Sequence, residues 1–187
     1  TASKVWYTLR GGELSEIYYP RIDTPSTRET ELVVTDGRTF TDRESRATTH
    51  RVRLLDRRSL TYQQVDRARS GKYVITKTYT TDPRRSTVLV DVQFRSLTGR
   101  RYKVFVVHDP ALNMTGNDDR GGTRRGALVA WDGHVADAVV HMAGDPRTSA
   151  SWDDVRERNI VGVYNVYESA RRAGVKKVVF ASTNHVM

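Results

Sequence analysis

Two glutamates near the start of the chain, Glu13 and Glu16, are the first residues whose type and spacing suggest chemistry. Hydrolysis of a glycosidic bond uses two carboxyl groups, one protonated and one ionised. Glutamates beside a Gly-Gly turn are also common as exposed polar residues with no further role. The spacing therefore predicts either a general acid and base or two solvated side chains.

A second polar group occupies positions 108–122, where His108 precedes a segment that contains Gly121 and Gly122. The candidate ligands in this segment are Asp109, Asn113, Asn117, Asp118 and Asp119. Oxygen ligands on a glycine-containing loop suit a hard cation such as Ca²⁺, although the spacing differs from that of an EF-hand. A bound cation would activate water, with His108 or His134 as the proton acceptor. The alternative is a solvated, turn-rich loop.

Short runs of alternating apolar and polar residues predict the strands that must position these side chains. We expect strands at Val5–Arg10, Leu14–Tyr19, Glu31–Thr35, His50–Asp56, Leu60–Val65, Tyr73–Thr80, Thr87–Phe94 and Arg101–Val107. Turn pairs such as Gly11-Gly12 and Asp36-Gly37 separate them. In the run TVLVDVQFRS, the Val and Phe residues share one face, which predicts a half-buried strand. Many short strands of this kind predict an antiparallel β-sandwich.

The sequence pattern changes near Asp137. An apolar strand over 137–142, a helix from the N-cap Ser151 to Gly174 and a second strand at Lys177–Ser182 predict a β-α-β unit. We therefore expect an α+β fold. It consists of a β-sandwich over residues 1–132 and a Rossmann-like β-α-β fragment over 133–187 that packs on it.

Composition limits the partners and the compartment. The 187 residues carry a net charge of +9 and contain no cysteine, so disulfides, thiolate nucleophiles and Cys-ligated zinc are excluded. The arginines alternate with apolar positions as solvent-facing strand residues do, and no recognition helix is evident, so nucleic acid is not favoured. No apolar run is long enough to span a bilayer, and the first residues lack a signal-peptide pattern. We expect a soluble protein with no membrane partner, in a compartment that the sequence leaves open.

Three long motifs occur in order in the first part of the chain: VWYTLRGGELSEIYYPRIDTPSTRETELVVTDGRTFTDRES, KTYTTDPRRSTVLVDVQFRSLTG and HDPALNMTG. Over roughly residues 3–135 they resemble the N-terminal β-sandwich of bacterial glucodextranases and glucoamylases, in glycoside hydrolase family fifteen. The resemblance implies a truncated supersandwich. It also implies that the catalytic glutamates belong to an (α/α)-barrel that this chain does not contain.

A further motif, DAVVHMAGDPRTSASWDDVRERNIVGVYNVYESARRAGVKKVVFASTNHV, resembles the middle of extended short-chain dehydrogenases of the NAD-dependent epimerase and uronate dehydrogenase type. The resemblance places Ala143 and Gly144 beside the cofactor, Asn159 on the next helix and Thr183 at the catalytic Ser/Thr position. The dehydrogenase-like stretch is not preceded by a glycine-rich turn at the start of a first strand, and it ends at Met187, before the position of the family's Tyr-x-x-x-Lys pair. We therefore expect no NAD binding and no NAD-dependent oxidoreductase activity. The two resemblances together predict a chimera joined between Ala127 and Val140.

The leading functional prediction is a carbohydrate-associated β-sandwich module fused to a dehydrogenase fragment that cannot use NAD. One alternative is a small Ca²⁺-assisted hydrolase of a glycoside, ester or lactone, and a second is a basic protein that binds an anionic polymer. The expected ligand is a carbohydrate or another small molecule. Because a truncated sandwich exposes strand edges, we also expect a homodimer.

Overall fold

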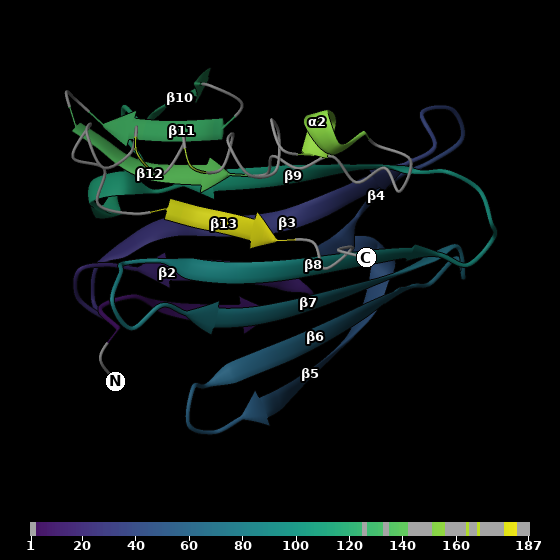
Figure 1. Cartoon of the computed structure of the whole chain (residues 1–187), viewed down its shortest axis with the longest axis horizontal. Helices are drawn as coiled ribbons and strands as arrows, with labels where there is room; N and C mark the ends of the chain where they lie inside the picture. The colour runs from purple at the N-terminus through teal and green to yellow at the C-terminus, as the bar shows by residue number, and fades with distance from the viewer. Residues whose placement is uncertain are drawn as a thin grey trace.

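The computed structural model of the chain describes residues 3–124, 127–132, 135–141, 151–155, 164, 168 and 178–182. Within these residues the protein is mostly antiparallel β-sheet with few, short helices, arranged as two stacked sheets (Figure 1). The antiparallel β-sandwich expected from the alternating runs is therefore confirmed for these residues.

The first sheet has five strands. They are β1 (Trp6–Arg10), β2 (Glu13–Tyr18), β3 (Pro25–Thr35), β4 (Thr41–Arg43) and β9 (Lys103–Pro110). The 11-residue β3 pairs with β2 and then β4 along one edge, and with β9 along the other. Between β1 and β2, Gly11 and Gly12 both adopt positive φ angles, which only glycine adopts without strain.

The second sheet has eight strands. In spatial order they are β10 (Arg120–Arg124), β11 (Ala127–Asp132), β12 (Val135–His141), β13 (Val178–Ser182), β8 (Val88–Ser96), β7 (Tyr73–Thr81), β6 (Thr61–Ala68) and β5 (Thr48–Asp56). All neighbouring strands are antiparallel except at β13, which runs parallel to both β12 and β8 and lies between them (Figure 1). The C-terminal strand therefore belongs to the main sheet.

Short helices connect the strands. They are α1 (Glu44–Ala47), the 3₁₀ turn η1 (Leu112–Met114) and α2 (Trp152–Val155). The helix expected from Ser151 to Gly174 is described only at α2 and at residues 164 and 168, so the β-α-β prediction lies largely outside the described residues. In the part of the chain that the structure describes, no helix has the length and hydropathy needed to cross a membrane.

The core lies between the two sheets, where alternate residues of facing strands meet. One cluster joins Val5, Leu14, Ile17, Tyr79 and Val88, and a second joins Leu32, Val34, Ala68, Tyr73 and Ile75. The apolar face predicted for Val88–Phe94 is confirmed, because Val90 packs on the first cluster while Val92 and Phe94 pack on the second. Period-two alternation therefore identified the buried face correctly.

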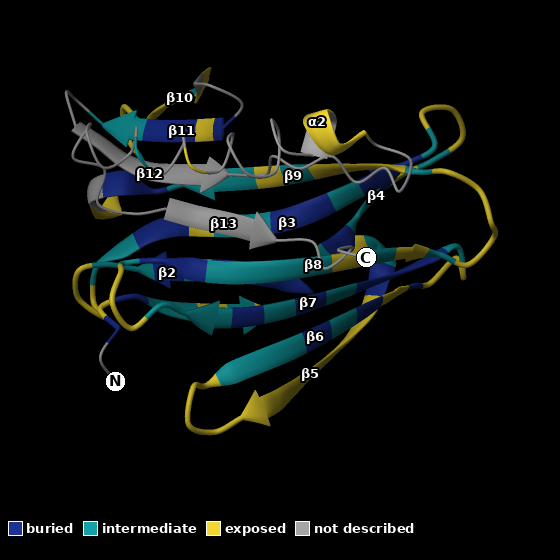
Figure 2. Cartoon of the chain, in the orientation of Figure 1, coloured by how far each residue is buried: buried dark blue, intermediate teal, exposed yellow. Residues whose placement is uncertain are grey.

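The strand bounds differ from the expected ones mainly at β3. This strand begins at Pro25, whereas the sequence pattern predicted Glu31. Its first half, PSTRET, carries polar side chains on both faces and therefore lacks the apolar alternation that marks a strand. At the far edge of the second sheet, β5 is exposed along residues 49–56 (Figure 2).

Candidate functional site

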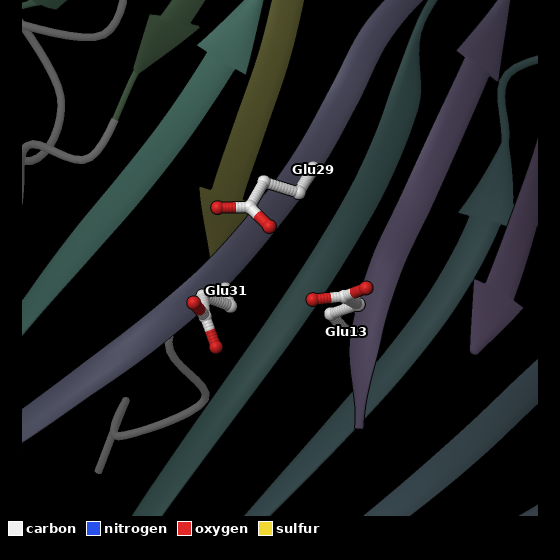
Figure 3. Close-up of side chains that lie close together, drawn as sticks. All are labelled: Glu13, Glu29 and Glu31. Carbon is white, nitrogen blue, oxygen red and sulfur yellow. The ribbon is translucent and has the colours of Figure 1, made fainter. Parts of the chain in front are cut away.

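Three glutamates meet on one face of the first sheet. Carboxylate oxygens of Glu13, Glu29 and Glu31 all lie within 4.8 Å of one another (Figure 3). The register explains this, because Leu14 on β2 pairs with Thr30 on β3, which brings Glu13 opposite Glu31 and diagonal to Glu29. Strand pairing therefore brings the three carboxyl groups together.

Arg43 is the cation that this cluster binds. It lies on β4 opposite Val33, donates to Glu29 at 2.6 Å and forms an ion pair with Glu31. Glu31 also accepts hydrogen bonds from the backbone N–H and the hydroxyl of Ser45, at 3.1 and 2.7 Å. Burial alone would raise the pKa of Glu31, but the hydrogen bonds from Ser45 and Arg43 hold it below its ordinary value.

Glu13 has a different environment. It is only 9% exposed, and its carboxyl group makes no hydrogen bond or ion pair within the described part of the chain. Burial, followed by the charges of Glu29 and Glu31, raises the pKa of Glu13, against the opposing charges of Arg10 and Arg43. The cluster thus combines one carboxyl group that favours its proton with two that are tied to a guanidinium.

Glu16, the predicted partner of Glu13, is outside this group. Its carboxylate accepts a hydrogen bond from the Tyr18 hydroxyl at 2.5 Å and a longer one from Thr8 at 3.4 Å. The close neighbours of Glu13 come instead from β3. Sequence reasoning missed Glu29 and Glu31 because the strand was expected to begin only at residue 31. Alternating glutamates within RETE were the available signal.

The predicted cation loop is divided between separate structural roles. His108 and Asp109 belong to β9, where Asp109 pairs with Glu29. Asp119 instead accepts the backbone N–H of Leu112 at 2.9 Å, at the start of η1.

Two other predicted ligands, Asn117 and Asp118, lie in the turn after η1. Asn117 donates its backbone N–H to the Thr115 hydroxyl, and Asp118 has a positive φ. The side chain of Asn113 and all of His134 lie outside the described residues, as do Ala143, Gly144, Asn159 and Thr183.

His108 is a partly buried histidine on the inner side of β9. Its Nδ1 lies 2.7 Å from the hydroxyl of Thr30, the residue opposite it in the β3–β9 ladder. Nε2 is buried and finds no partner among the described residues. Burial lowers the pKa of His108 to about 4, against the opposing charge of Asp109. A neutral imidazole at physiological pH fits a structural role better than that of an exposed general base.

A second charged group, which the sequence analysis did not single out, lies inside the sandwich. Glu44 from α1 and Asp66 from β6 are fully buried, and Lys77 from β7 is 3% exposed. The Lys77 ammonium lies 2.8 Å from Glu44 Oε2 and 3.5 Å from Asp66 Oδ2. It also donates to the carbonyl oxygen of Gly12 at 2.8 Å. The sequence feature that could have revealed this group is a lysine at an inward position of β7, between Ile75 and Tyr79.

Neighbouring groups fix this triad in place. Glu44 Oε2 accepts the backbone N–H of Leu32 at 3.0 Å, and Asp66 Oδ2 accepts the Gln64 amide at 2.7 Å. Burial raises the pKa of Glu44 well above its ordinary value. Lys77 opposes this effect, and the hydrogen bond and charge of Asp66 reinforce it. A single ammonium therefore faces two carboxyl groups, and burial favours the protonated form of one of them, Glu44.

Comparison with known proteins gives two separate similarities. A glucoamylase from Clostridium sp. (strain G0005) is 37% identical over 121 residues, which are 64% of this chain and 17% of that protein. The crystal structure of a bacterial glucoamylase complexed with acarbose has a TM-score of 0.63 and 32% identity, over 69% of this chain and 21% of that one. The chain thus spans about a fifth of the length of these relatives.

The second similarity is to sugar dehydrogenases. An L-arabinose 1-dehydrogenase (NAD(P)(+)) from Haloferax volcanii is 56% identical over 57 residues, which are 30% of this chain and 22% of that protein. A uronate dehydrogenase from Pseudomonas putida is 43% identical over 51 residues, or 27% of this chain and 19% of that protein. The likeness to dehydrogenases therefore covers only a short stretch.

One family model accounts for most of the chain, because the family described as glucodextranase, domain N matches residues 1–155. This range contains the whole first sheet and the charged groups described above. The similarity to glucoamylases supports the family match independently. The chain belongs to the glucodextranase domain N family.

Proposed function

We propose that this chain is a carbohydrate-associated β-sandwich module that binds or positions sugar and does not itself cleave it. The observation that carries the proposal is the family match over residues 1–155, together with the likeness to a glucoamylase solved with acarbose. The local geometry agrees with it. Glu29 and Glu31 are held by Arg43, and Glu16 is held by Tyr18, so three of the acidic side chains available for glycoside hydrolysis already have structural partners.

Isothermal titration calorimetry tests the binding half of this proposal. The chain would be titrated with maltotetraose and with acarbose, and cellotetraose would serve as the length-matched control. Saturable heats for the first two ligands are expected. Flat heats for all three would remove carbohydrate recognition from the proposal.

An assay for glucose release tests the non-catalytic half. The chain would be incubated with the same malto-oligosaccharides, and product would be followed over time. No release above the buffer blank is expected. Turnover that is lost in Glu13→Gln and retained in Glu16→Gln would show a reaction centre at the carboxylate cluster and overturn this half of the proposal.

We also propose that the chain is a chimera, with a dehydrogenase-derived segment from about residue 133 that does not bind NAD. Two similarities to unrelated enzymes, over 121 and 57 residues, support the proposal. The family match to residue 155 continues past this boundary, and β13 pairs with β8 inside the main sheet. The later segment would then have been recruited into the sandwich. Titration with NAD tests the cofactor claim, and saturable binding would contradict it.

A calcium-assisted hydrolase is the second candidate function, because three carboxylates approach within 4.8 Å and Glu13 lacks a partner among the described residues. Such a site would use Glu13, Glu29 and Glu31 as oxygen ligands in place of the predicted loop around Asp119. Calcium titration of the wild type, Glu13→Gln and the same-strand control Glu16→Gln would decide it. Binding lost only in Glu13→Gln supports this candidate, and absence of calcium heat in the wild type removes it.

A homodimer remains part of the proposal. Its support is β5, the end strand of the second sheet, which exposes Val52 and Leu55 at 46% each. An uncovered edge strand with apolar side chains is a ready template for pairing with another strand. Light scattering after size-exclusion chromatography measures the mass directly, and a monomer at micromolar concentration would refute the dimer.

A further inference from the structure

Lys77 and Asp66 lie on adjacent strands with their side chains in contact inside the sandwich. The β6–β7 register pairs Gln64 with Lys77 and Asp66 with Ile75, so Asp66 is the diagonal neighbour of Lys77 on the inward face. The Lys77 nitrogen is 3.5 Å from Asp66 Oδ2, and both residues are buried. An amine and a carboxyl group thus meet at close range in a site that excludes water. This is the proximity that favours reaction between them.

Glu44 contacts the same amine and is placed to move protons. Its Oε2 lies 2.8 Å from the Lys77 nitrogen and is fixed by the N–H of Leu32 at 3.0 Å. A carboxyl group with a raised pKa can donate a proton to a leaving oxygen and take one back from the amine. The raised pKa of Glu44 is consistent with this behaviour.

We propose that Lys77 and Asp66 condense to an intramolecular isopeptide bond, with Glu44 as the catalytic residue for proton transfer. The Lys77 ammonium first passes one proton to the Asp66 carboxylate. The neutral Lys77 amine then attacks the Asp66 carboxyl carbon, so a C–N bond forms and one C–O bond breaks. Glu44 gives its proton to the departing oxygen, which leaves as water, and takes a proton from the nitrogen. One ammonium and one carboxylate become one amide and one water, without an oxidant, reductant or activating group.

Hydrogen-bond partners for the product are already in position. The amide N–H replaces the ammonium as donor to the Gly12 carbonyl oxygen, now 2.8 Å from the Lys77 nitrogen. The amide oxygen, if it is Asp66 Oδ2, keeps the hydrogen bond from the Gln64 amide at 2.7 Å. The other oxygen, Oδ1, is buried and finds no partner among the described residues, so it is the one that can leave without breaking a hydrogen bond.

Removal of charge favours the condensation. Burying an ammonium and carboxylates away from water carries a large desolvation penalty, which a neutral, hydrogen-bonded amide avoids. The bond also closes a short loop between β6 and β7, which restricts the unfolded chain as other cross-links do. The product is therefore the more stable state of these two side chains within this fold.

Intact-mass spectrometry of the purified, folded chain is the direct test. The expected mass is about 18 Da below that of the sequence, one water per chain. Tryptic digestion should release a branched peptide that joins residues 59–67 to residues 73–84, uncut after Lys77. A full sequence mass after prolonged incubation of the folded protein would overturn the proposal.

Variants separate this bond from other dehydrations, such as succinimide formation at Asp36-Gly37. Lys77→Arg should restore the full mass, whereas Lys72→Arg, at a neighbouring lysine, should keep the loss. Asp66→Asn should react with loss of ammonia, about 17 Da, and give the same branched peptide. A mass loss that persists in Lys77→Arg would place the dehydration elsewhere and overturn the assignment.

Glu44→Gln tests the proton-transfer role. The variant keeps the size of the side chain and an oxygen for the Leu32 N–H, and its folding would be checked by circular dichroism. In folded Glu44→Gln we expect either the full sequence mass or cross-linking slowed by at least about tenfold. A slowing of that size would be attributed to the loss of general acid–base catalysis. Cross-linking at the wild-type rate would show that Glu44 has no part in the reaction.

Discussion

Acidification should destabilise this protein through His108. The imidazole Nδ1 is 2.7 Å from the Thr30 hydroxyl, and Nε2 is buried with no partner among the described residues. Burial lowers its pKa to about 4 in the folded protein, against an ordinary value of 6.5. The unfolded chain therefore takes up a proton at a pH where the folded chain does not.

The sign and size of the change in unfolding free energy follow from this difference in pKa. Above pH 6.5 the histidine is neutral in both states and its full contribution to stability is present, and that contribution is lost as the pH falls from 6.5 towards 4. Each pKa unit is worth about 1.4 kcal/mol, so acidification from pH 7.5 to 4.5 should lower the free energy of unfolding by about 2–3 kcal/mol through this residue. The charge of Asp109 acts in the opposite direction and is already included in the lowered pKa.

Urea unfolding at four pH values between 7.5 and 4.5, followed by tryptophan fluorescence, measures the effect. The wild type is compared with His108→Gln, which can still bond to Thr30 but does not titrate. Subtracting one curve from the other cancels the contributions of the remaining carboxylates. The matched exchange at exposed His50 on β5 controls for loss of an imidazole. If His108→Gln loses stability with acid as steeply as the wild type, the buried, neutral histidine is refuted.

Three further changes test the packing at buried positions: the turn beside Lys77, the η1 turn and the Tyr79 side chain. Gly12→Ala places a Cβ at a φ of +88°, 3.2 Å from His50 Nδ1, and should lower the free energy of unfolding by about 1–3 kcal/mol in chemical denaturation. Leu112→Ala empties a fully buried position that packs against Ala130 and should cost about 2–5 kcal/mol, so a calorimetric melt unchanged from wild type would contradict that packing. Tyr79→Phe removes a buried hydroxyl that has no described partner, so stability should stay level or rise by about 1 kcal/mol. A clear loss in urea titration would mean that the hydroxyl is bonded after all.

The strand pattern was predictable because it is a local property. Val88–Phe94 reads as a half-buried strand from its alternation alone, and the structure buries that face as expected. The first half of β3 was missed for the same reason, because PSTRET alternates no apolar residues. Its polar side chains make specific hydrogen bonds instead, such as Ser26 to the Ile17 carbonyl and Thr30 to His108, which hydrophobic periodicity does not detect.

The candidate site was only partly accessible from sequence. Glu13 was identified as a candidate acid, but its close neighbours proved to be Glu29 and Glu31. Asp109, expected to share a cation with Asp119, lies opposite Glu29 in the β3–β9 ladder, whereas Asp119 accepts the Leu112 N–H. The sequence shows which acidic residues are candidates for a site. Which of them lie together depends on which strands pair and in what register.

By itself the sequence determined the antiparallel β-sandwich, the turn positions and the buried face of the clearest strand, because each depends on neighbouring residues in the chain. Only the tertiary structure brought Glu44, Asp66 and Lys77 together, and placed Arg43 on Glu29 and Glu31. Period two tells which face a side chain takes, but strand order and register decide what it meets on that face, and these are set by contacts between residues far apart in sequence.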